Sequence, residues 1–505
     1  MTQALRDSQS YISSHAMTII TIWLATLPAL YILLRHVNKS NQSIHPKGCR
    51  RLGLPPDRSN LHDEYDPKYT HGVPENSTDN TDRPAWRVKA LFTYPIKSCA
   101  GIELESADVV STGLAYDRHF CFAENIPPRQ QPDCAGNVPH DSENNATATP
   151  AETHWTARTM RDGHFSRLAL IRPEIWVPDP QTADYAPDLD EVKSQGVMII
   201  YYPRLLPHGH EPHPTLGRRL RILALTLAIK IGLLPTHHAI SIPLSPPKDT
   251  PTAPVKIWKD SPLAYDYRQY IPQSLRSFLQ PSEPNKDSKP LTLFATSPSH
   301  TRPIFRNAPR KESLGFQPVT AFADAYPLHL INLASVHDVA SRCLLDRLSV
   351  RRFRANIIVT GPECFEEDSW KRIRVYHRSN FRCRFLNHDD QNHTQDHYQS
   401  TPNHDNEDNF KNEYTEIHTV CRTMRCKLPN VDPATGLRHR VEPDRSLRKY
   451  RCIDPGDRTN AALGMQLVPK VREFTLCVND TIKVMERGEH CYIKMLKPGE
   501  VWEGV

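Results

Sequence analysis

The sequence predicts a β-rich α+β fold in which short strands form barrels and helices are few. Segments rich in β-branched and aromatic residues recur along the chain, at 86–96, 119–124, 196–203, 238–246 and 253–267. Only two polar helical stretches are expected, at 270–279 and 334–348. Proline is abundant, at 45 of 505 residues, and it falls mostly in the tracts between strands. Many short strands with such boundaries favour barrel architecture.

The first 37 residues predict a single transmembrane helix. After a short tail (1–16), the stretch from Met17 to Leu34 has 18 residues without a charge, about 27 Å as a helix. A secretory signal is the rival interpretation, but the run is longer than the usual ~7–15 apolar residues and no small-residue cleavage site follows. Lys and Arg are concentrated downstream, which places the bulk of the chain in the cytosol. We therefore expect a single-pass anchor over 17–37.

Several polar tracts are expected to be disordered. Residues 38–85 are read as a tether, and 125–152 and 378–412 as insertions that cannot bury enough apolar surface to fold. The second insertion is rich in His and Asp and could bind metal, but a solvated insertion is favoured. The apolar run from Leu220 to Pro235 is interrupted by charges and is too short to span a bilayer, so a core or membrane-surface helix is expected.

Common cofactor and catalytic motifs are absent. The chain has no dinucleotide, Walker A, zinc-protease or nucleophile-elbow motif, and we recognise no haem, flavin or nicotinamide site of its own. A net charge of +6 without a basic-aromatic stripe argues against nucleic-acid binding. In a reducing cytosol the 12 cysteines are thiols unless they bind something.

Four short clusters carry cations beside polar or thiol groups. Lys97-Ser98 follows a strand, Asp117-Arg118 precedes one, RRFRAN spans 351–356, and Arg425-Cys426 precedes an Asp-Pro turn. Such donors suit phosphate and polar heterocycles. Positive charge also favours the ionised form of a thiol.

Taken in chain order, the motifs resemble those of MOSC proteins, in the branch that has an N-terminal MOSC β-barrel domain and includes amidoxime-reducing proteins. The matching stretches are YPIKSCAGIEL, YDRHFCFAE, TARTM, DAYPLHLINLASVHDV, RFRANIIVTG, FEEDSWKRIRV and RCKLPNVDPATG. The resemblance implies an N-terminal MOSC β-barrel domain over 86–300 and a MOSC β-barrel domain over 301–505, behind the transmembrane helix.

The resemblance also implies a molybdenum cofactor, a metal-bearing pyranopterin, with Cys426 as the protein's thiolate ligand. It places Asp324 near the metal and puts Thr156 and Ala157 on a loop whose backbone approaches the cofactor. Two departures from the family pattern, Met424 before the Arg-Cys pair and Tyr326-Pro327 after the acid, concern substrate preference. The remaining cofactor contacts carried over are Lys97, Ser98, Arg118, Arg354, Asn356 and Arg425.

The function implied is a membrane-anchored molybdenum oxidoreductase that reduces small N-hydroxylated substrates, with Asp324 orienting the substrate or relaying protons. Electrons would come from cytochrome b5 and its NADH-dependent reductase, at the outer mitochondrial membrane or alternatively the endoplasmic reticulum. A carrier of the cofactor or its sulfur, like the tail of molybdenum-cofactor sulfurases, is the alternative. Those enzymes carry a large pyridoxal-phosphate domain, whereas only 85 residues precede Trp86 here. A family member without activity is a third interpretation.

Two cysteines compete for the ligand role. In the family that the chain resembles, the ligand directly follows an arginine and precedes a strand and an Asp-Pro turn, which implies Cys426 and not Cys421. On an extended strand their opposite parity would direct them to opposite faces. A zinc site is the main rival, and burial of both thiols without any ligand is the other. The zinc site would use His418, Cys421, Cys426 and Cys452.

Overall fold

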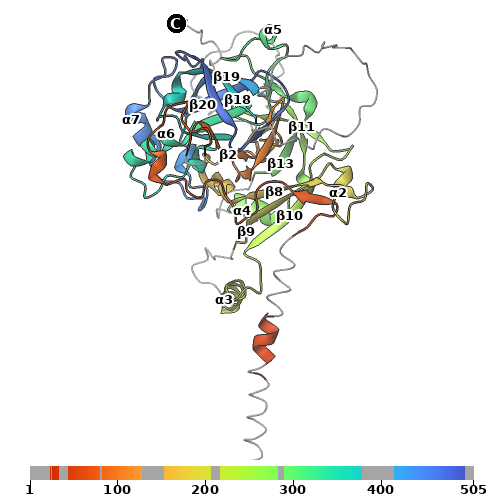
Figure 1. Cartoon of the computed structure of the whole chain (residues 1–505). Helices are drawn as coiled ribbons and strands as arrows, with labels where there is room; N and C mark the ends of the chain where they lie inside the picture. Colours follow the sequence, from red (N-terminus) through yellow and green to blue (C-terminus); the bar gives the residue numbers. More distant parts are fainter. Residues whose placement is uncertain are drawn as a thin grey trace, which may run out of the picture. The chain divides into compact units, whose positions relative to one another are not determined.

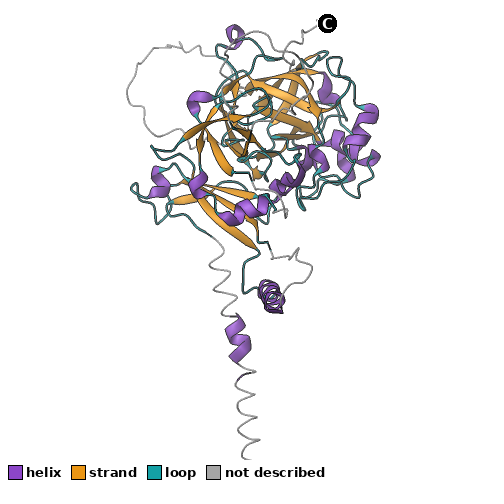
Figure 2. Ribbon diagram, turned by 180° about the vertical axis from the view of Figure 1, so that it is seen from behind, coloured by secondary structure: helices purple, strands orange, loops and turns teal. Residues whose placement is uncertain are grey.

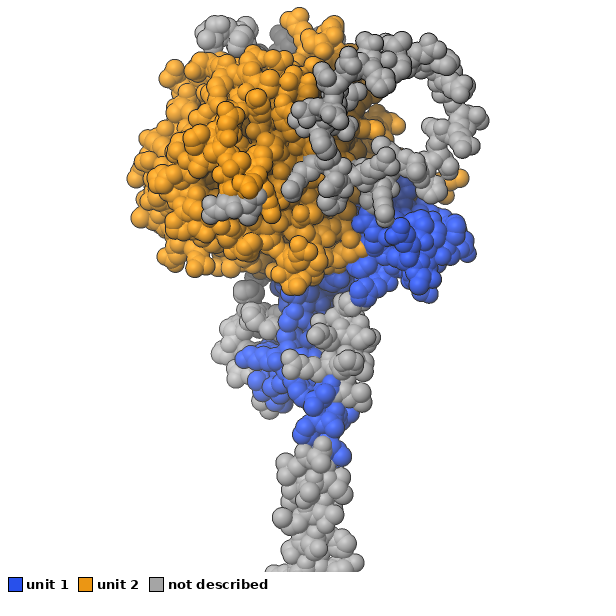
Figure 3. Space-filling view, in the orientation of Figure 1, with its two compact units in different colours: residues 1–50, 175–245 blue, residues 51–174, 246–505 orange. Residues whose placement is uncertain are grey.

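The structure is a computed structural model. It describes residues 23, 26–32, 44–79, 82–127, 153–205, 216–281, 289–377 and 414–494. These residues fall into two units, coloured separately in Figure 3: one comprises 1–50 and 175–245, the other 51–174 and 246–505. Strands dominate the described chain, as Figure 2 shows, so the predicted β-rich fold is confirmed.

The larger unit contains an eight-stranded sheet whose pairing closes on itself (Figure 1). An additional pairing of β17 with β2 joins seven strands into a ring, with β3 at its side. Strand β2 (Arg87–Thr93) thus pairs with strands more than 200 residues later in the chain. In order, the strands are β17 (Ile357–Thr360), β16 (Leu328–Asn332), β20 (Ala461–Pro469), β19 (Tyr414–Arg425), β18 (Trp370–Tyr376), β22 (Thr481–Arg487), β2 (Arg87–Thr93) and β3 (Ile102–Leu104).

A second, closed barrel of five strands lies in the same unit. Its interior is apolar, with Cys121, Val255, Ala264 and Phe294 fully buried. The segment 253–267, expected as one strand, is a hairpin of two. The barrel order is β11 (Thr252–Lys256), β12 (Leu263–Asp266), β13 (Leu291–Thr296), β6 (Phe120–Ile126) and β7 (His154–Ala157).

Two small sheets and several short helices complete this unit. The sheets are β14 (Arg302–Pro303) with β15 (Val319–Thr320), and β21 (Phe474–Cys477) with β4 (Ser106–Val110) and β5 (Gly113–Leu114). The α-helices are α4 (Gln273–Leu279), α5 (Lys311–Leu314), α6 (Leu333–Arg342) and α7 (Asp444–Tyr450). The 3₁₀ turns are η1 (Pro67–Tyr69), η2 (Gly163–Leu170), η3 (Arg268–Tyr270), η4 (Pro298–His300), η5 (Val350–Phe353), η6 (Glu366–Ser369) and η7 (Leu428–Asn430).

Helix α6 (Leu333–Arg342) is shorter than the predicted helical stretch 334–348. Asn332 caps it, accepting a hydrogen bond from the Ala334 N–H at 3.2 Å, and the helix ends before Cys343. Its apolar face packs in a core cluster with Ala90, Ile331 and Leu463.

The smaller unit contains a four-stranded sheet, in the order β1 (Cys49–Arg51), β8 (Arg172–Pro178), β9 (Val197–Pro203) and β10 (His237–Pro243). Its two helices are α2 (Asp190–Lys193) and α3 (Leu216–Lys230). The helix expected at 220–235 is confirmed by α3, but it does not lie in the core, and a location at a membrane surface stays a prediction. Leu220, Leu223 and Leu227 on α3 are 57%, 66% and 56% exposed, so they lie on a face that no described segment covers.

The expected tether is also wrong for most of its length. Leu61 is 2% exposed and packs in the core cluster around α6, and the buried carboxylate of Glu64 accepts hydrogen bonds from the Ser349 hydroxyl at 3.0 Å and the Val350 N–H at 3.0 Å. The burial of Leu61 and the hydrogen bonds of Glu64 thus hold this polar stretch against the core around α6. Composition averaged over 38–85 does not reveal such specific contacts.

Other predicted segments lie mostly outside the described residues. They are 1–37 apart from 23 and 26–32, and the two insertions apart from 125–127, of which Asn125 and Ile126 end strand β6. In the part of the chain that the structure covers, no helix is long and apolar enough to cross a membrane.

A buried carboxyl beneath α6 makes stability depend on pH. Glu367 is fully buried and accepts hydrogen bonds from the Ser335 hydroxyl at 2.8 Å and the Asn332 amide at 3.3 Å. Burial, and then the neighbouring charge of Asp368, raise the pKa of Glu367 to about 7. The folded chain therefore holds a proton that the unfolded chain releases between about pH 4.5 and 7.

We expect the free energy of unfolding to fall as pH rises through that window, because the folded state binds more protons there. Glu367→Gln should remove this dependence and exceed the parent in stability at pH 8 by more than ~1 kcal/mol. Urea unfolding at pH 5 and pH 8 measures it, with the exposed Glu312→Gln as control. An equal pH response in parent and Glu367→Gln would contradict the assignment.

Candidate active site

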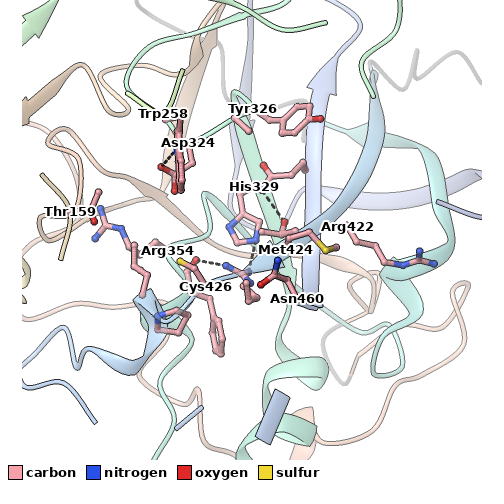
Figure 4. A pocket seen from close by; sticks show the side chains of 18 of the residues that line it. Thr159, Trp258, Asp324, Tyr326, His329, Arg354, Arg422, Met424, Cys426 and Asn460 are labelled. Atoms are coloured by element: carbon pink, nitrogen blue, oxygen red, sulfur yellow. Dashed lines mark hydrogen bonds between the residues drawn. The ribbon is translucent and has the colours of Figure 1, made fainter. Parts of the chain in front are cut away.

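One cavity of about 350 Å³ collects most of the predicted site residues, which come from loops and strand ends of both barrels (Figure 4). Its lining also includes Thr159, Arg161, Trp258 and His329, to which the sequence analysis gave no role. The predicted residues that line it are Lys97, Ser98, Arg118, Asp324, Arg354, Asn356, Arg425 and Cys426.

Three of these residues have left-handed backbone conformations. Ser98, Arg118 and Arg354 have φ of 67°, 50° and 55°. Such angles are disfavoured for residues with a Cβ and tend to cluster at functional sites. The Ser98 hydroxyl also makes no hydrogen bond to any described residue, so it is free to bind a ligand.

The aromatic ring of Tyr94 packs against the guanidinium groups of two arginines that line the cavity. The guanidinium carbons of Arg118 and Arg354 lie 4.5 and 4.3 Å from the centre of its ring. Arg118 is further fixed by donating to the Asp117 carboxylate at 2.5 Å, whereas Nη2 of the buried Arg354 has no hydrogen-bond partner. An unpartnered buried guanidinium nitrogen is costly, and it identifies Arg354 as a donor for a bound acceptor.

Asn356 is expected to contact the cofactor, but its side-chain polar atoms are hydrogen-bonded to other residues of the chain. Its amide nitrogen donates to the Phe92 carbonyl at 3.1 Å and the Asp117 carboxylate at 3.0 Å, and its oxygen accepts from Arg118 at 3.2 Å. With its polar atoms already used, Asn356 positions Arg118.

Lys97 and Asp324 form an ion pair at the cavity wall. The Lys97 ammonium donates to Asp324 Oδ1 at 2.5 Å and to the Phe322 carbonyl at 2.9 Å. The Lys97 side chain is 7% exposed, whereas that of Asp324 is 53% exposed. Desolvation opposes ionisation of both groups, but the charges of Lys97 and Arg161 hold the pKa of Asp324 well below its usual value. Asp324 is therefore a carboxylate at neutral pH, an acceptor of hydrogen bonds.

The two candidate cysteines lie in different surroundings. Cys426 follows the end of β19 and lines the cavity, while Cys421 is fully buried in an apolar cluster with Val420 and Val468. Burial raises the pKa of Cys421 to about 12. The parity argument is wrong in detail, because two register shifts interrupt β19 between Thr419 and Met424. Even so, of the two only Cys426 lines the cavity.

Arg425 is clamped behind Cys426. It donates to the Leu463 carbonyl at 2.9 Å, the Phe353 carbonyl at 3.2 Å and His329 Nε2 at 2.7 Å. Burial, with the charge of Arg425, keeps the pKa of His329 well below its usual value, so the neutral ring accepts this bond. The same burial lowers the pKa of Arg425 to about 9.

The expected loop at Thr156 and Ala157 is wrong, because both residues belong to β7. There they pair with Glu124 and Ala123 of β6, and they do not line the cavity. The chain reaches the cavity two to four residues later, at Thr159 and Arg161. The polar stretch that follows the strand, TMRDG, is the sequence signal for that turn.

Arg161 is the main cavity residue that the sequence analysis missed. Its Nε donates to the Thr159 hydroxyl at 3.3 Å, and its guanidinium lies near enough to Cys426 and Asp324 to interact with them electrostatically. Burial would lower the pKa of Arg161, but the negative charges of Cys426 and Asp324 raise it. The guanidinium thus supplies positive charge directly at the thiol.

The zinc alternative is not supported. No group of three or more His, Cys, Asp and Glu side chains that could hold a metal occurs among the described residues, which include His418, Cys421, Cys426 and Cys452.

The cavity residues fit an anionic group that carries a soft metal. Within the described chain, Arg161, Arg354 and Arg425 form no ion pair with a carboxylate, and Arg354 Nη2 is orphaned. Guanidinium groups bind phosphate-like oxygens, and a thiolate suits a soft metal. Among the described residues that line the cavity, Cys426 is the one that carries a thiol.

Two family models match the chain. One describes a MOSC N-terminal beta barrel domain and matches residues 85–132; the other describes a MOSC domain and matches 317–412. The chain therefore contains a MOSC N-terminal β-barrel domain and a MOSC domain.

The chain is also similar to curated proteins that are named for a specific activity. Mitochondrial amidoxime-reducing component 1 of Danio rerio is 32% identical over 144 residues (28% of this chain, 33% of the relative), and component 2 of Rattus norvegicus is 30% identical over 135 residues (27% and 29%). Component 1 of Xenopus laevis is 24% identical over 221 residues (44% and 51%). The match to the first two spans about a third of their length.

Proposed function

We propose that the chain is a molybdenum-dependent oxidoreductase that reduces N-hydroxylated compounds of the amidoxime type. The supporting observation is the cavity that a thiol, Cys426, lines together with buried guanidinium groups, one of which has a nitrogen, Arg354 Nη2, without a hydrogen-bond partner. The names of the relatives point to the same reaction class.

In this proposal the molybdenum cofactor supplies two-electron redox chemistry when it is bound. Cys426 provides the protein's thiolate to the metal, and Arg354 and Arg425 provide charge toward the anionic part of the cofactor. Ser98 and Lys97 lie at the same wall. Arg161 lines the same cavity and supplies positive charge near Cys426.

Substrate orientation falls to Asp324. Because its carboxylate stays ionised, it accepts hydrogen bonds from the N–OH and amino groups of a substrate and does not release a proton near neutral pH. The overall change takes up two electrons and two protons, breaks the N–O bond and releases water. Of the two roles expected for Asp324, the structure thus favours orientation over proton relay.

Several features of the proposal go beyond the cavity. We propose a single-pass anchor at 17–37, a cytosolic catalytic part, a location at the outer mitochondrial membrane, and cytochrome b5 with its NADH-dependent reductase as electron donors. The relatives' names are consistent with the organelle.

The test is analysis of the full-length chain for molybdenum and pterin, together with turnover of an aryl amidoxime supplied with cytochrome b5, its reductase and NADH. Bound molybdenum with conversion of the amidoxime to the amidine is the expected result. Bound molybdenum without turnover, also when a chemical reductant replaces the protein donors, would favour the carrier function. A chain that binds neither metal nor pterin would overturn the proposal.

A further inference from the structure

The turn between β11 and β12 holds Trp258 in an unusual conformation. The Ile257 N–H donates to the Asp260 carbonyl at 2.8 Å and the Asp260 N–H to the Ile257 carbonyl at 3.0 Å, so Trp258 is the first residue of a two-residue turn. Its φ is 57°, whereas φ of the next residue, Lys259, is not positive. Two-residue hairpins with this pattern favour glycine at the first position. A large aromatic residue here is strained, and such strain is associated with function.

A buried arginine ties this turn to the cavity wall. Arg302 is 6% exposed; its Nε donates to Asp260 Oδ2 at 2.7 Å, and its Nη1 donates to the Ala323 carbonyl at 2.6 Å. Arg302 Nη2 also lies 3.4 Å from the backbone oxygen of Asp324. One guanidinium therefore fixes the turn that carries Trp258 relative to the loop that carries Asp324.

The Trp258 side chain faces the cavity and remains accessible (Figure 4). Its indole N–H donates to Asp324 Oδ1 at 3.4 Å, and the Arg161 guanidinium lies 4.6 Å from its ring centre. Trp258 is 47% exposed, whereas Tyr326 and Phe353, which also line the cavity, are 5% and 2% exposed and Tyr492 is half-buried. Trp258 thus offers an accessible aromatic surface beside the Asp324 carboxylate and the Arg161 guanidinium.

We propose that Trp258 determines substrate specificity by packing against a planar aromatic group attached to the N-hydroxylated centre. This inference rests on the proposed function. Offset stacking on the indole would hold the aromatic part of the substrate at the cavity wall, while Asp324 accepts hydrogen bonds from the reacting group. A saturated ring of similar size lacks the flat π-face and gains less from this contact.

The experiment compares benzamidoxime with its saturated analogue cyclohexanecarboxamidoxime, in full-length chains carrying Trp258, Trp258→Phe or Trp258→Gly. The ratio of kcat/KM for the aromatic over the saturated substrate should fall about five- to tenfold in Trp258→Gly. Trp258→Phe should retain most of it. Lys259→Gly, the adjacent residue of the same turn, is the matched control and should keep the parent ratio.

Thermal unfolding separates specificity from a structural role. Because glycine relieves the left-handed strain, Trp258→Gly should melt at the same temperature as the parent or higher. A merely structural tryptophan would instead give a lower melting temperature and an unchanged substrate ratio, which would overturn the inference.

Direct calorimetric binding of benzamidoxime to the same chains distinguishes the two proposals. Turnover with an unchanged ratio would refute the role of Trp258 and leave the proposed function intact. Binding that weakens in Trp258→Gly, without turnover by any chain, would refute the proposed function and support the aromatic contact. Absence of both binding and turnover in the parent chain would refute both.

Discussion

Cys426→Ala is expected to abolish N-reduction, with activity falling at least ~100-fold. Loss of a metal ligand should exceed the ~10–100-fold effects of removing groups that only orient ligands. The reason is local: Cys426 is the thiol in the cavity lining, and the positively charged Arg161 lines the same cavity. Activity, molybdenum content and the metal–thiolate absorption of the purified full-length chain measure the effect.

Cys421→Ala is the matched control, because it removes the same sulfur atom from β19, just before the segment that carries Cys426. Cys421 is fully buried in an apolar cluster with Tyr326, so its loss should lower stability by about 1 kcal/mol and leave most activity and metal–thiolate absorption intact. The assignment would be refuted by the reverse pattern, in which Cys421→Ala loses the metal–thiolate signal and Cys426→Ala keeps it.

Gly464→Ala is expected to cause the largest loss of stability among simple glycine substitutions near the site. Gly464 has φ of 77°, and a Cβ there would lie 2.5 Å from the Leu330 carbonyl oxygen and 2.9 Å from His329 Nε2. A backbone oxygen cannot move aside without shifting β16, so the cost should exceed ~2 kcal/mol. The displaced His329 would also release Arg425, and activity should fall with stability.

Gly315→Ala separates the clash from the backbone strain. Gly315 has φ of 80°, but a Cβ added there would meet no described atom within 4 Å, so only the conformational cost of about 1 kcal/mol applies. Denaturant unfolding and N-reduction should both show a clearly larger effect for Gly464→Ala. Equal effects would mean that the close approach at Gly464 does not constrain His329.

The sequence was sufficient for the strand segments and for the residue types of the site. Strand composition located β2, β6, β9 and β10 within a few residues, because β-branched and aromatic runs between prolines are local signals. Motif order brought Lys97, Ser98, Arg354 and Cys426 into one hypothesis, and all of them line one cavity. Fully local signals could not show how those strands pair.

Contacts between segments that are distant in the chain decided which other residues are buried or line the cavity. Leu61 is buried although its neighbours are polar, since one apolar side chain suffices where the core cluster receives it. Arg161 and Trp258 enter the cavity because the β7 strand end and the β11–β12 turn meet there, and neither residue is distinguished by its neighbours in the chain. Conversely, Thr156 and Ala157 are held in β7 by pairing with β6, across an insertion that hides this register in the sequence.

The sequence by itself thus determined the β-rich character of the chain and the position of the cationic clusters, and it predicted Cys426 rather than Cys421 as the ligand. These follow from local composition and from motif order. Only the tertiary structure decided that Asp324 is held ionised by Lys97, that Asn356 is a positioning residue, and that Arg161 reaches the thiol. Each of these depends on distances between groups that are far apart in the chain, and such distances are set by strand pairing and by burial.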